Sequence, residues 1–440
     1  MKRRLTFGES LAMTSMLFGL FFGAGNLIFP VSLGQAAGHS VWMALFGFLI
    51  SAAGMPLLAV TALGITQSSG VLELSSHAGK FYSYAFSCAL YLCIGPLFAI
   101  PRCITVPHEV GIVPMLSAGV DPRVTLALFS FCMFAAILWF SLRPTKILVW
   151  VGKIFNPLLL VMLLWLTVRA LLNPMGGFSQ FEPQAEYASS AFLKGILEGY
   201  NTMDALAGLA FGIVIINVLR GLKVEDPEEI AMYTVETGFF SCLLMSVIYA
   251  ALALIGAQSR GLFGVSPNGG VALGLISKHY FTGFGNIFLA LTVLLACLKT
   301  AIGLVVSCSE TFCRMFPNIM SYKKWAVLFS VISFVLANTG LTMIIKLAVP
   351  VLVTLYPLAI ALIAVSLATR GRLYDKRAMA TILLFTLVGA LTDSFCTSSA
   401  STLAGVARRW IPFVSYGFGW VIFMAVGWIL ALLTGARSRR

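Results

Sequence analysis

The sequence predicts an all-α membrane protein of about twelve transmembrane helices, two of which are interrupted near the middle of the bilayer. Of the 440 residues, 59% are hydrophobic and 10% are charged, whereas soluble proteins carry about 25% charged residues. Apolar runs of roughly 20 residues, long enough to cross a bilayer, recur from one end of the chain to the other. Two of these runs carry glycine or polar residues at their centres.

No hydrophilic domain interrupts the apolar runs, so we expect one transmembrane domain over residues 1–440. The first run follows "MKRR" and is longer than the apolar core of a secretory signal, so we expect it to remain as the first span. The expected spans are 9–36, 41–66, 80–106, 124–142, 147–172, 192–219, 231–257, 283–311, 325–338, 341–367, 378–397 and 412–434.

The basic residues lie in short segments between the spans, which accounts for the net charge of +13. An even number of spans places both termini on one side, and most Lys and Arg lie on that side. The positive-inside rule therefore predicts that both termini lie in the cytoplasm. No basic domain is present to bind nucleic acid, so the lipid bilayer is the expected surrounding.

Residue types that carry enzyme or channel chemistry are not grouped. The nine cysteines are scattered without a CxxC pair, and the four histidines are far apart. We therefore expect no metal site and no cofactor, and no enzyme. A channel would need rings of polar side chains along a pore, and the spans contain no such set.

Two loops on the side opposite the termini are long. Residues 173–191 are polar and rich in turn formers. Residues 258–282 contain an amphipathic stretch, "GGVALGLISKHY". Two interpretations remain open for this stretch, a lid over an opening or an interfacial helix without a gating role.

The first interruption is Gly23-Ala24-Gly25-Asn26, in "FGLFFGAGNLIFP" (18–30). Each glycine costs roughly 1 kcal/mol relative to alanine inside a helix, so the helix is weak here. Close helix packing would also explain small residues. Irregular backbone at membrane depth persists only beside protein or a water-filled cavity.

The second interruption lies in the sixth span, "ILEGYNTMDALAGLAFGIVII" (196–216). Tyr200, Asn201 and Thr202 all carry hydrogen-bonding side chains, and Asp204 follows near mid-span. A carboxylate at this depth is expensive and indicates a functional site.

Spans 1 and 6 take corresponding positions if the chain consists of two five-helix halves, residues 1–172 and 173–367, followed by two helices in 368–440. Broken segments at corresponding positions of two halves indicate a binding site near the midplane. Free N–H groups at a break suit a carboxylate, and free carbonyl groups suit an ammonium or a metal cation. Such a site fits a zwitterionic amino acid, with Phe21, Phe22, Met203 and Leu206 near its side chain.

Four stretches carry a resemblance to the bacterial branched-chain amino acid:cation symporters. "FFGAGNLIFP" followed by "LGQAAG" resembles their first span, and "EGYNTMDALAGLAFGIVII" resembles their sixth. "GPLFAIPR" (95–102) and "LACLKTAIGLVVSCSE" (295–310) resemble spans 3 and 8. The resemblance implies a leucine-transporter-like fold of five-plus-five inverted helices with two additional C-terminal helices. It also implies uptake of leucine, isoleucine and valine driven by sodium or protons; methionine fits the same volume.

The resemblance also implies roles for individual residues. The residues expected around the substrate are Phe22, Gly23, Ala24, Gly25, Asn26, Tyr200, Asn201, Thr202 and Asp204. Related sodium-coupled transporters place two adjacent hydroxyl residues of span 8 on a sodium ion, facing carbonyl groups of span 1. The matching pair here is Lys299-Thr300, which makes a sodium site doubtful and leaves Na⁺ or H⁺ as the coupling ion.

Three interpretations of Lys299 remain open. Its ammonium could replace the sodium ion and make transport independent of sodium. A desolvated lysine can also release a proton, so Lys299 could carry the coupled proton. Alternatively, the lysine is structural and pairs with a carboxylate such as Asp204, with sodium bound elsewhere or unused.

Other charges within the spans predict pairs or gates. Arg102 is expected to pair with Glu109 or to act as an outer gate. Glu310 and Arg314 have the four-residue spacing of a helix ion pair, with a gate as the alternative. Lys346 lies near a span end and is expected to reach the interface.

These observations predict a secondary active transporter that alternates its opening about a site built from spans 1, 3, 6 and 8. Its small-molecule partner would be a medium-sized apolar amino acid. An exchanger and a non-transporting amino-acid sensor of the same fold remain alternatives, and the sequence does not indicate an oligomeric state.

Overall fold

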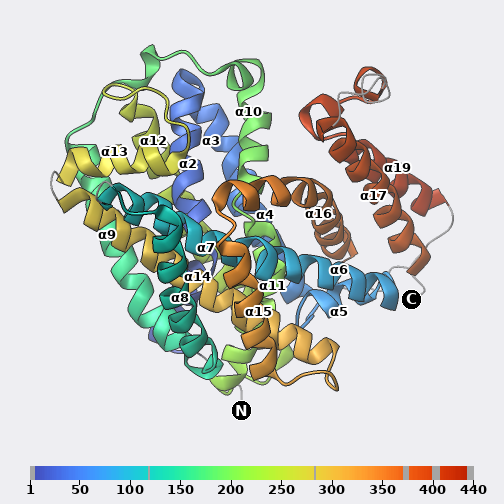
Figure 1. Cartoon of the computed structure of the whole chain (residues 1–440). Coiled ribbons are helices and arrows are strands. Elements are labelled where there is room, and N and C mark those ends of the chain that lie inside the picture. Colours follow the sequence, from blue (N-terminus) through green and yellow to red (C-terminus); the bar gives the residue numbers. More distant parts are fainter. Residues whose placement is uncertain (1–4, 117–118, 282–283, 370–375, 399–406, 434–440) are drawn as a thin grey trace.

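The computed structural model describes residues 5–116, 119–281, 284–369, 376–398 and 407–433, and these residues form helices and connecting turns without a strand (Figure 1). Within them, nine helical stretches are long and apolar enough to cross a membrane, and two shorter apolar helices lie near the ends of the chain. The basic residues of "MKRR" and of 370–375, which contribute to the predicted orientation, lie outside the described residues, as do residues 282–283 and 434 at the edges of the expected spans.

Each of the twelve expected spans contains a helix or a pair of helices, which confirms the predicted architecture. The first half contains α1 (Phe7–Phe21), α2 (Ala24–Ala37), α3 (Val41–Leu49), α4 (Met55–Ile65), α5 (Val71–Ser76), α6 (Lys80–Leu92), α7 (Ala99–Pro107), α8 (Pro122–Ser141) and α9 (Asn156–Leu172). The second half contains α10 (Ala185–Tyr200), α11 (Asp204–Gly221), α12 (Pro227–Ser259), α13 (Gly269–Phe281), α14 (Gly285–Met315), α15 (Tyr322–Ala337) and α16 (Leu341–Thr369). Two further helices, α17 (Lys376–Ser398) and α19 (Trp420–Leu433), follow.

The packing of the broken spans follows the pattern expected of two equivalent halves. The first broken span is the pair α1 and α2, and the sixth is the pair α10 and α11. Helix α2 packs against α12, and its counterpart α11 packs against α4; likewise α1 packs against α12 and α10 against α3. These two contacts of the first broken span therefore have counterparts at the second broken span, while the exact boundaries of the halves stay a prediction.

Glycine allows the backbones of α2 and α12 to touch. A Cβ atom on Gly34 would lie 1.9 Å from the carbonyl O of Ala253, and one on Gly256 would lie 2.3 Å from that of Val31. Both distances are shorter than any real contact, so only glycine fits at these two positions. Small residues at a helix interface are how membrane helices approach closely.

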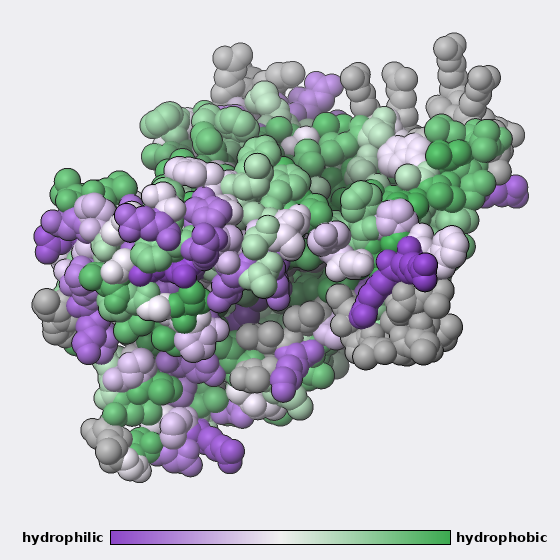
Figure 2. Space-filling model, turned by 90° about the horizontal axis from the view of Figure 1, so that it is seen from above, coloured by the Kyte–Doolittle hydropathy of each residue, from purple (hydrophilic) through white to green (hydrophobic). Residues whose placement is uncertain are grey.

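The outer surface suits a lipid environment. Large apolar side chains such as Leu128, Val161, Leu164 and Val247 are exposed. Broad hydrophobic areas surround the hydrophilic patches on the face seen in Figure 2. The chain is therefore a multi-pass membrane protein whose apolar exterior would contact acyl chains.

A helix forms in the long loop 258–282, as its amphipathic stretch suggests. This helix, α13, packs against α2 and α14 (Figure 1). Because α2 is the second half of a broken span, α13 lies directly on an element of the predicted site. Its role as a lid stays a prediction.

The helices α17 and α19 pack against each other at one edge of the bundle, and α17 also contacts α16 (Figure 1). Helix α19 begins at Trp420, several residues later than expected from the apolar run, because Phe413 and Gly417 take positive φ angles. The buried carboxylate of Asp393 on α17 accepts hydrogen bonds from the N–H groups of Gly419 (3.1 Å) and Trp420 (2.9 Å). It therefore caps the start of α19 from a neighbouring helix.

Replacing Asp393 with alanine should destabilise this pair of helices by roughly 1–2 kcal/mol, the usual effect of losing a helix N-cap. Hydrogen exchange over residues 407–433 in detergent should become faster in D393A. The neighbouring Thr392 bonds only within its own helix, to Val388, so T392A serves as the control. Equal exchange in D393A and T392A would show that the cap does not stabilise α19.

Candidate functional site

The first break is held open by the side chain of Asn26. Helix α1 ends at Phe21 and α2 begins at Ala24. The N–H of Gly23 donates to Oδ1 of Asn26 over 2.9 Å, so the asparagine caps the helix that it belongs to. The first N–H groups of α2 have no intrahelical partner and carry the positive end of the helix dipole. The amide in an otherwise apolar stretch thus stabilises the buried start of α2.

The second break lies between Tyr200, the last residue of α10, and Asp204, the first of α11. Met203 takes a left-handed conformation with φ of 65°, which turns the chain sharply. The hydroxyl of Thr202 donates to the carbonyl of Gly199 over 2.8 Å. The carbonyl end of α10 and the amino end of α11 therefore meet at this point.

A buried polar network joins the two breaks. Nδ2 of Asn26 donates to Oδ2 of Asp204 over 2.7 Å, and the hydroxyl of Tyr249 donates to the same oxygen over 2.7 Å. The Asn26 amide also contacts the Tyr249 hydroxyl. All three side chains are at most 2% exposed. The carboxylate expected to mark a functional site thus links α2, α11 and α12.

A small cavity of about 30 Å³ lies beside this network. Its polar wall carries peptide groups and side chains of both breaks, namely Gly23, Ala24, Gly25, Asn26, Thr202 and Asp204. Its apolar wall is formed by Leu20, Phe21, Ile94, Ala207, Phe211 and Leu304, and Arg102, Cys103, Met203 and Thr300 also line it. The cavity offers helix N–H groups, a carboxylate and an apolar surface within one small volume. We call it the central cavity.

Seven of the eleven predicted site residues line the central cavity, namely Gly23, Ala24, Gly25, Asn26, Thr202, Asp204 and Thr300. The ring of Phe22 lies behind it, 6.0 Å from the Tyr249 ring. The ring of Tyr200 stacks on Tyr356 with the ring centres 4.4 Å apart. The carbonyl of Asn201 accepts a hydrogen bond from Arg102. The roles of all these residues in binding stay predictions.

Lys299 is fully buried at the carbonyl end of α1. Its Nζ donates to the carbonyl O of Gly19 over 3.0 Å and to Oδ1 of Asn156 over 3.3 Å. The ammonium also lies over the rings of Phe18 (5.2 Å) and Phe22 (5.6 Å). A cation at this end of a helix is favourable because the carbonyl groups there carry the negative end of the dipole.

The suggested pairing of Lys299 with Asp204 is wrong. Asp204 bonds to Asn26 and Tyr249, whereas Lys299 faces Gly19 and Asn156. The neighbouring hydroxyl of Thr300 also donates to Gly19, over 3.4 Å. The ammonium and this hydroxyl thus share one carbonyl group of span 1.

Two other predicted ion pairs are replaced by bonds to groups from elsewhere in the fold. In the described structure Arg102 donates to the carbonyl O of Asn201 over 2.9 Å, not to Glu109. Glu310 and Arg314 are bridged by Asn217, which donates to Glu310 over 2.7 Å and accepts from Arg314 over 3.0 Å. Lys346 is exposed on its helix, as expected for a residue near a span end.

Tyr249 and Asn156 were not predicted as site residues. Each lies in an apolar span where one polar side chain resembles many others that face a neighbouring helix. Tyr249 sits in "SVIYAALAL" and Asn156 in "GKIFNPLLL". The stretch around Tyr249 contains no break and no charge, so no local signal marks that position. Around Asn156, Lys153 and Pro157 are the local signals that could have drawn attention to it.

The fold resembles those of two solved transporters. It matches the closed structure of Mhp1, a nucleobase-cation-symport-1 family transporter with bromovinylhydantoin bound, with a TM-score of 0.59 and 16% identity, covering 96% of this chain and 91% of that chain. It matches MhsT in complex with L-phenylalanine with a TM-score of 0.50 and 14% identity, covering 98% and 100%. At these identities the likeness establishes the fold alone.

Two broken helices that meet at a closed cavity within a bundle of this fold define a leucine-transporter-like membrane transport protein rather than an enzyme. The sequence matches the family described as branched-chain amino acid transport protein over residues 7–437, and the chain belongs to this family. It is 48% identical to the branched-chain amino acid permease BrnQ of Lactobacillus delbrueckii subsp. lactis, over 100% of both chains. It is 38% identical to BrnQ of Bacillus subtilis strain 168, over 98% of this chain and 97% of the relative, and 36% identical to BrnQ of Escherichia coli K12, over the same shares.

Proposed function

We propose that this chain is a secondary active transporter that takes up leucine, isoleucine and valine across the bacterial inner membrane. The observation that carries the proposal is the junction of the two breaks through Asn26, Asp204 and Tyr249 beside a cavity with an apolar wall. The names of the relatives, which are branched-chain amino acid permeases, support the same substrate class. The distribution of basic residues supports cytoplasmic termini, with α13 on the outer side.

The polar wall of the central cavity suits the charged groups of an amino acid, and the apolar wall suits its side chain. The N–H groups at the start of α2 suit the carboxylate, because they are unpaired within the helix and lie at its positive end. The carbonyl groups at the end of α10 and the Asp204 carboxylate suit the ammonium. The rings of Phe21 and Phe211 and the side chains of Ile94 and Leu304 suit a branched aliphatic group. The site would discriminate poorly against methionine, because one methylene changes the free energy of binding by only ~1–3 kcal/mol.

Lys299 supports coupling without a sodium ion. Its ammonium lies where related sodium-coupled transporters place hydroxyl ligands of the ion, against a carbonyl group of span 1. A fixed positive charge there would repel a second cation. Transport would then proceed without sodium, with the proton as the coupling ion when Lys299 changes its protonation state during the cycle.

Uptake of labelled leucine by proteoliposomes tests this proposal. We expect uptake to follow an imposed proton gradient, to persist when choline replaces sodium, and to be inhibited by isoleucine and valine among the twenty amino acids. Counterflow without net accumulation would instead indicate an exchanger. Leucine binding without counterflow would indicate a sensor, and absence of leucine binding would overturn the substrate assignment.

A further inference from the structure

A second, larger cavity lies next to the central cavity on the side of α13. Its volume is about 590 Å³, and its wall includes Phe29 and Ser32 of α2, Glu109 beyond α7, Glu198 of α10, and Gly270 and Lys278 of α13. We call it the outer vestibule. Of the described residues, Arg102 alone lines both the outer vestibule and the central cavity. Its side chain therefore stands between the two volumes.

The guanidinium of Arg102 touches both broken spans. Its Nη1 donates to the carbonyl O of Asn201, in the second break, over 2.9 Å. A Cβ atom on Gly25, in the first break, would lie 3.1 Å from Nη2 of Arg102. The guanidinium also lies 5.8 Å from the centre of the Phe29 ring on α2. One side chain of span 3 thus connects the two segments that would have to separate to open the central cavity toward α13.

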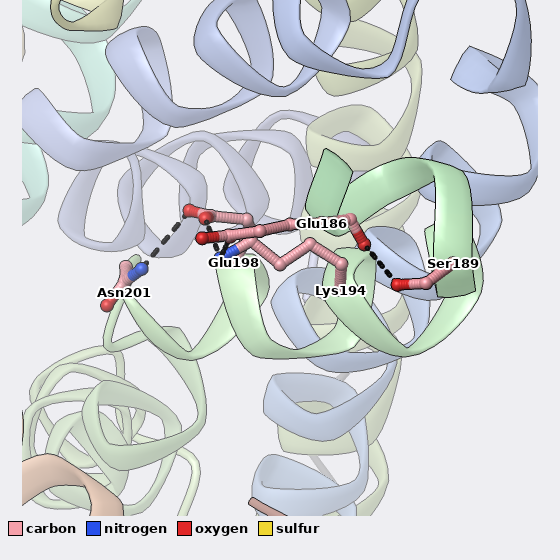
Figure 3. A network of polar contacts seen from close by, with 5 residues as sticks. All are labelled: Glu186, Ser189, Lys194, Glu198 and Asn201. Carbon is pink, nitrogen blue, oxygen red and sulfur yellow. Dashed lines mark hydrogen bonds and ion pairs between the residues drawn. The ribbon is translucent and has the colours of Figure 1, made fainter. Parts of the chain in front are cut away.

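The acceptor of this contact is itself fixed. Figure 3 shows a row of polar contacts along α10, in which Lys194 bridges Glu186 (2.6 Å) and Glu198 (3.2 Å). Glu198 accepts from the side-chain amide of Asn201 over 3.2 Å. The Asn201 carbonyl therefore moves with α10 as a unit. A bond to this carbonyl transmits force between α7 and α10.

We propose that Arg102 is the gate between the outer vestibule and the central cavity. While it holds the Asn201 carbonyl, the wall between the two volumes is closed. When the bond breaks, α10 and α2 are free to move away from α7. Because the acceptor is a neutral carbonyl and not a carboxylate, the bond is strong enough to hold the closed state yet weaker than a buried ion pair, which suits a contact that is broken in every cycle.

This proposal goes beyond the proposed function, and its test requires no substrate. Cys103 follows the gate residue, is 4% exposed and lines the central cavity. A membrane-impermeant methanethiosulfonate applied to proteoliposomes from the α13 side would reach it through the outer vestibule once the contact of Arg102 with Asn201 is broken. Modification of the Cys103 peptide, quantified by mass spectrometry, therefore measures how often the gate is open, whether or not leucine is the substrate.

Replacing Arg102 with glutamine should accelerate modification of Cys103 at least about tenfold, as expected for the loss of one charge-assisted hydrogen bond. R102K, which keeps the charge and one donor, should label at a rate between those of R102Q and the wild type. Arg260 provides a matched control, because it also donates to a carbonyl group, of Glu182 (2.7 Å), and lies over a ring, of Phe181 (5.0 Å). R260Q should label Cys103 at the wild-type rate.

Two outcomes would overturn the proposal. The first is labelling of Cys103 in R102Q at the wild-type rate. The second is acceleration by the same factor in R102Q, R102K and R260Q, which would indicate general loosening of the fold. Thermal unfolding of each variant in detergent measures loosening of the fold independently. If R102Q is loosened, the rate of Cys103 labelling in R102K, compared with that in the wild type, tests the gate. Absence of leucine binding by the wild type, together with faster Cys103 labelling in R102Q, leaves the gate in place and contradicts only the substrate assignment.

Discussion

Replacing Lys299 with methionine is expected to reduce leucine uptake about a hundredfold, because it leaves two buried acceptors, the Gly19 carbonyl and Oδ1 of Asn156, without a donor. Each buried unsatisfied polar group costs about 1–3 kcal/mol, and 1.4 kcal/mol corresponds to a factor of about ten. Replacing Lys299 with threonine should instead give uptake that depends on sodium. Positions 299 and 300 would then both carry hydroxyl groups facing Gly19, as in the related sodium-coupled transporters.

The measurement is initial uptake of labelled leucine into proteoliposomes, with sodium or choline outside, for the wild type, K299M, K299T and K346M. Lys346 is an exposed lysine of another span, so K346M should retain wild-type uptake. Normal uptake by K299M would exclude any role for the ammonium. Sodium-dependent uptake by the wild type would contradict the replacement of the ion. An inactive K299T that does not respond to sodium, together with proton-driven uptake by the wild type, would favour Lys299 as the proton carrier.

The interruptions were predictable because their chemistry is local. Glycine weakens a helix wherever it lies, and a carboxylate is costly at any point in the bilayer core, so Gly23, Gly25 and Asp204 mark the breaks without knowledge of the partners. The spans were predictable for a similar reason, because the length and hydrophobicity of an apolar run are also local properties of the sequence. The late start of α19 was not predicted, since it combines positive φ angles at Phe413 and Gly417 with a cap from Asp393, which lies on a different helix.

The partners of the buried charges could not be predicted, because they come from distant segments. Glu310 and Arg314 have the spacing of an ion pair, yet Asn217 of α11 lies between them and satisfies both. Arg102 has Glu109 two turns along its own span, but it donates to the Asn201 carbonyl of the second break. Buried polar groups take whichever partner the packing presents, and packing between helices leaves no signal in one sequence.

Replacing Asp204 with leucine is expected to weaken leucine binding about a hundredfold or more. The substitution leaves the amide of Asn26 and the hydroxyl of Tyr249 without their shared acceptor, at about 1–3 kcal/mol for each unsatisfied group. It also removes the contact that holds the start of α2 against the start of α11, so the N–H groups expected to bind the carboxylate lose their fixed position. D204N, which keeps an acceptor oxygen but loses the charge, should lose less. Equilibrium binding of labelled leucine to purified protein in detergent measures both effects.

A double-mutant cycle distinguishes the contribution of the hydrogen bonds among Asn26, Tyr249 and Asp204 from that of the Asp204 charge. Asn26 and Tyr249 donate to the same oxygen, so the effects of N26A and Y249F on leucine binding should fail to add, with a coupling energy of about 0.5–3 kcal/mol. The control is Y280F, since Tyr280 also donates one hydrogen bond, to the carbonyl of Asn173 over 2.8 Å, away from the central cavity. Because it shares no acceptor with Asn26, its effect should simply add to that of N26A. Wild-type affinity in D204L, or full additivity of N26A and Y249F, would mean that the two breaks are positioned by backbone packing alone and that the buried carboxylate does not organise the site.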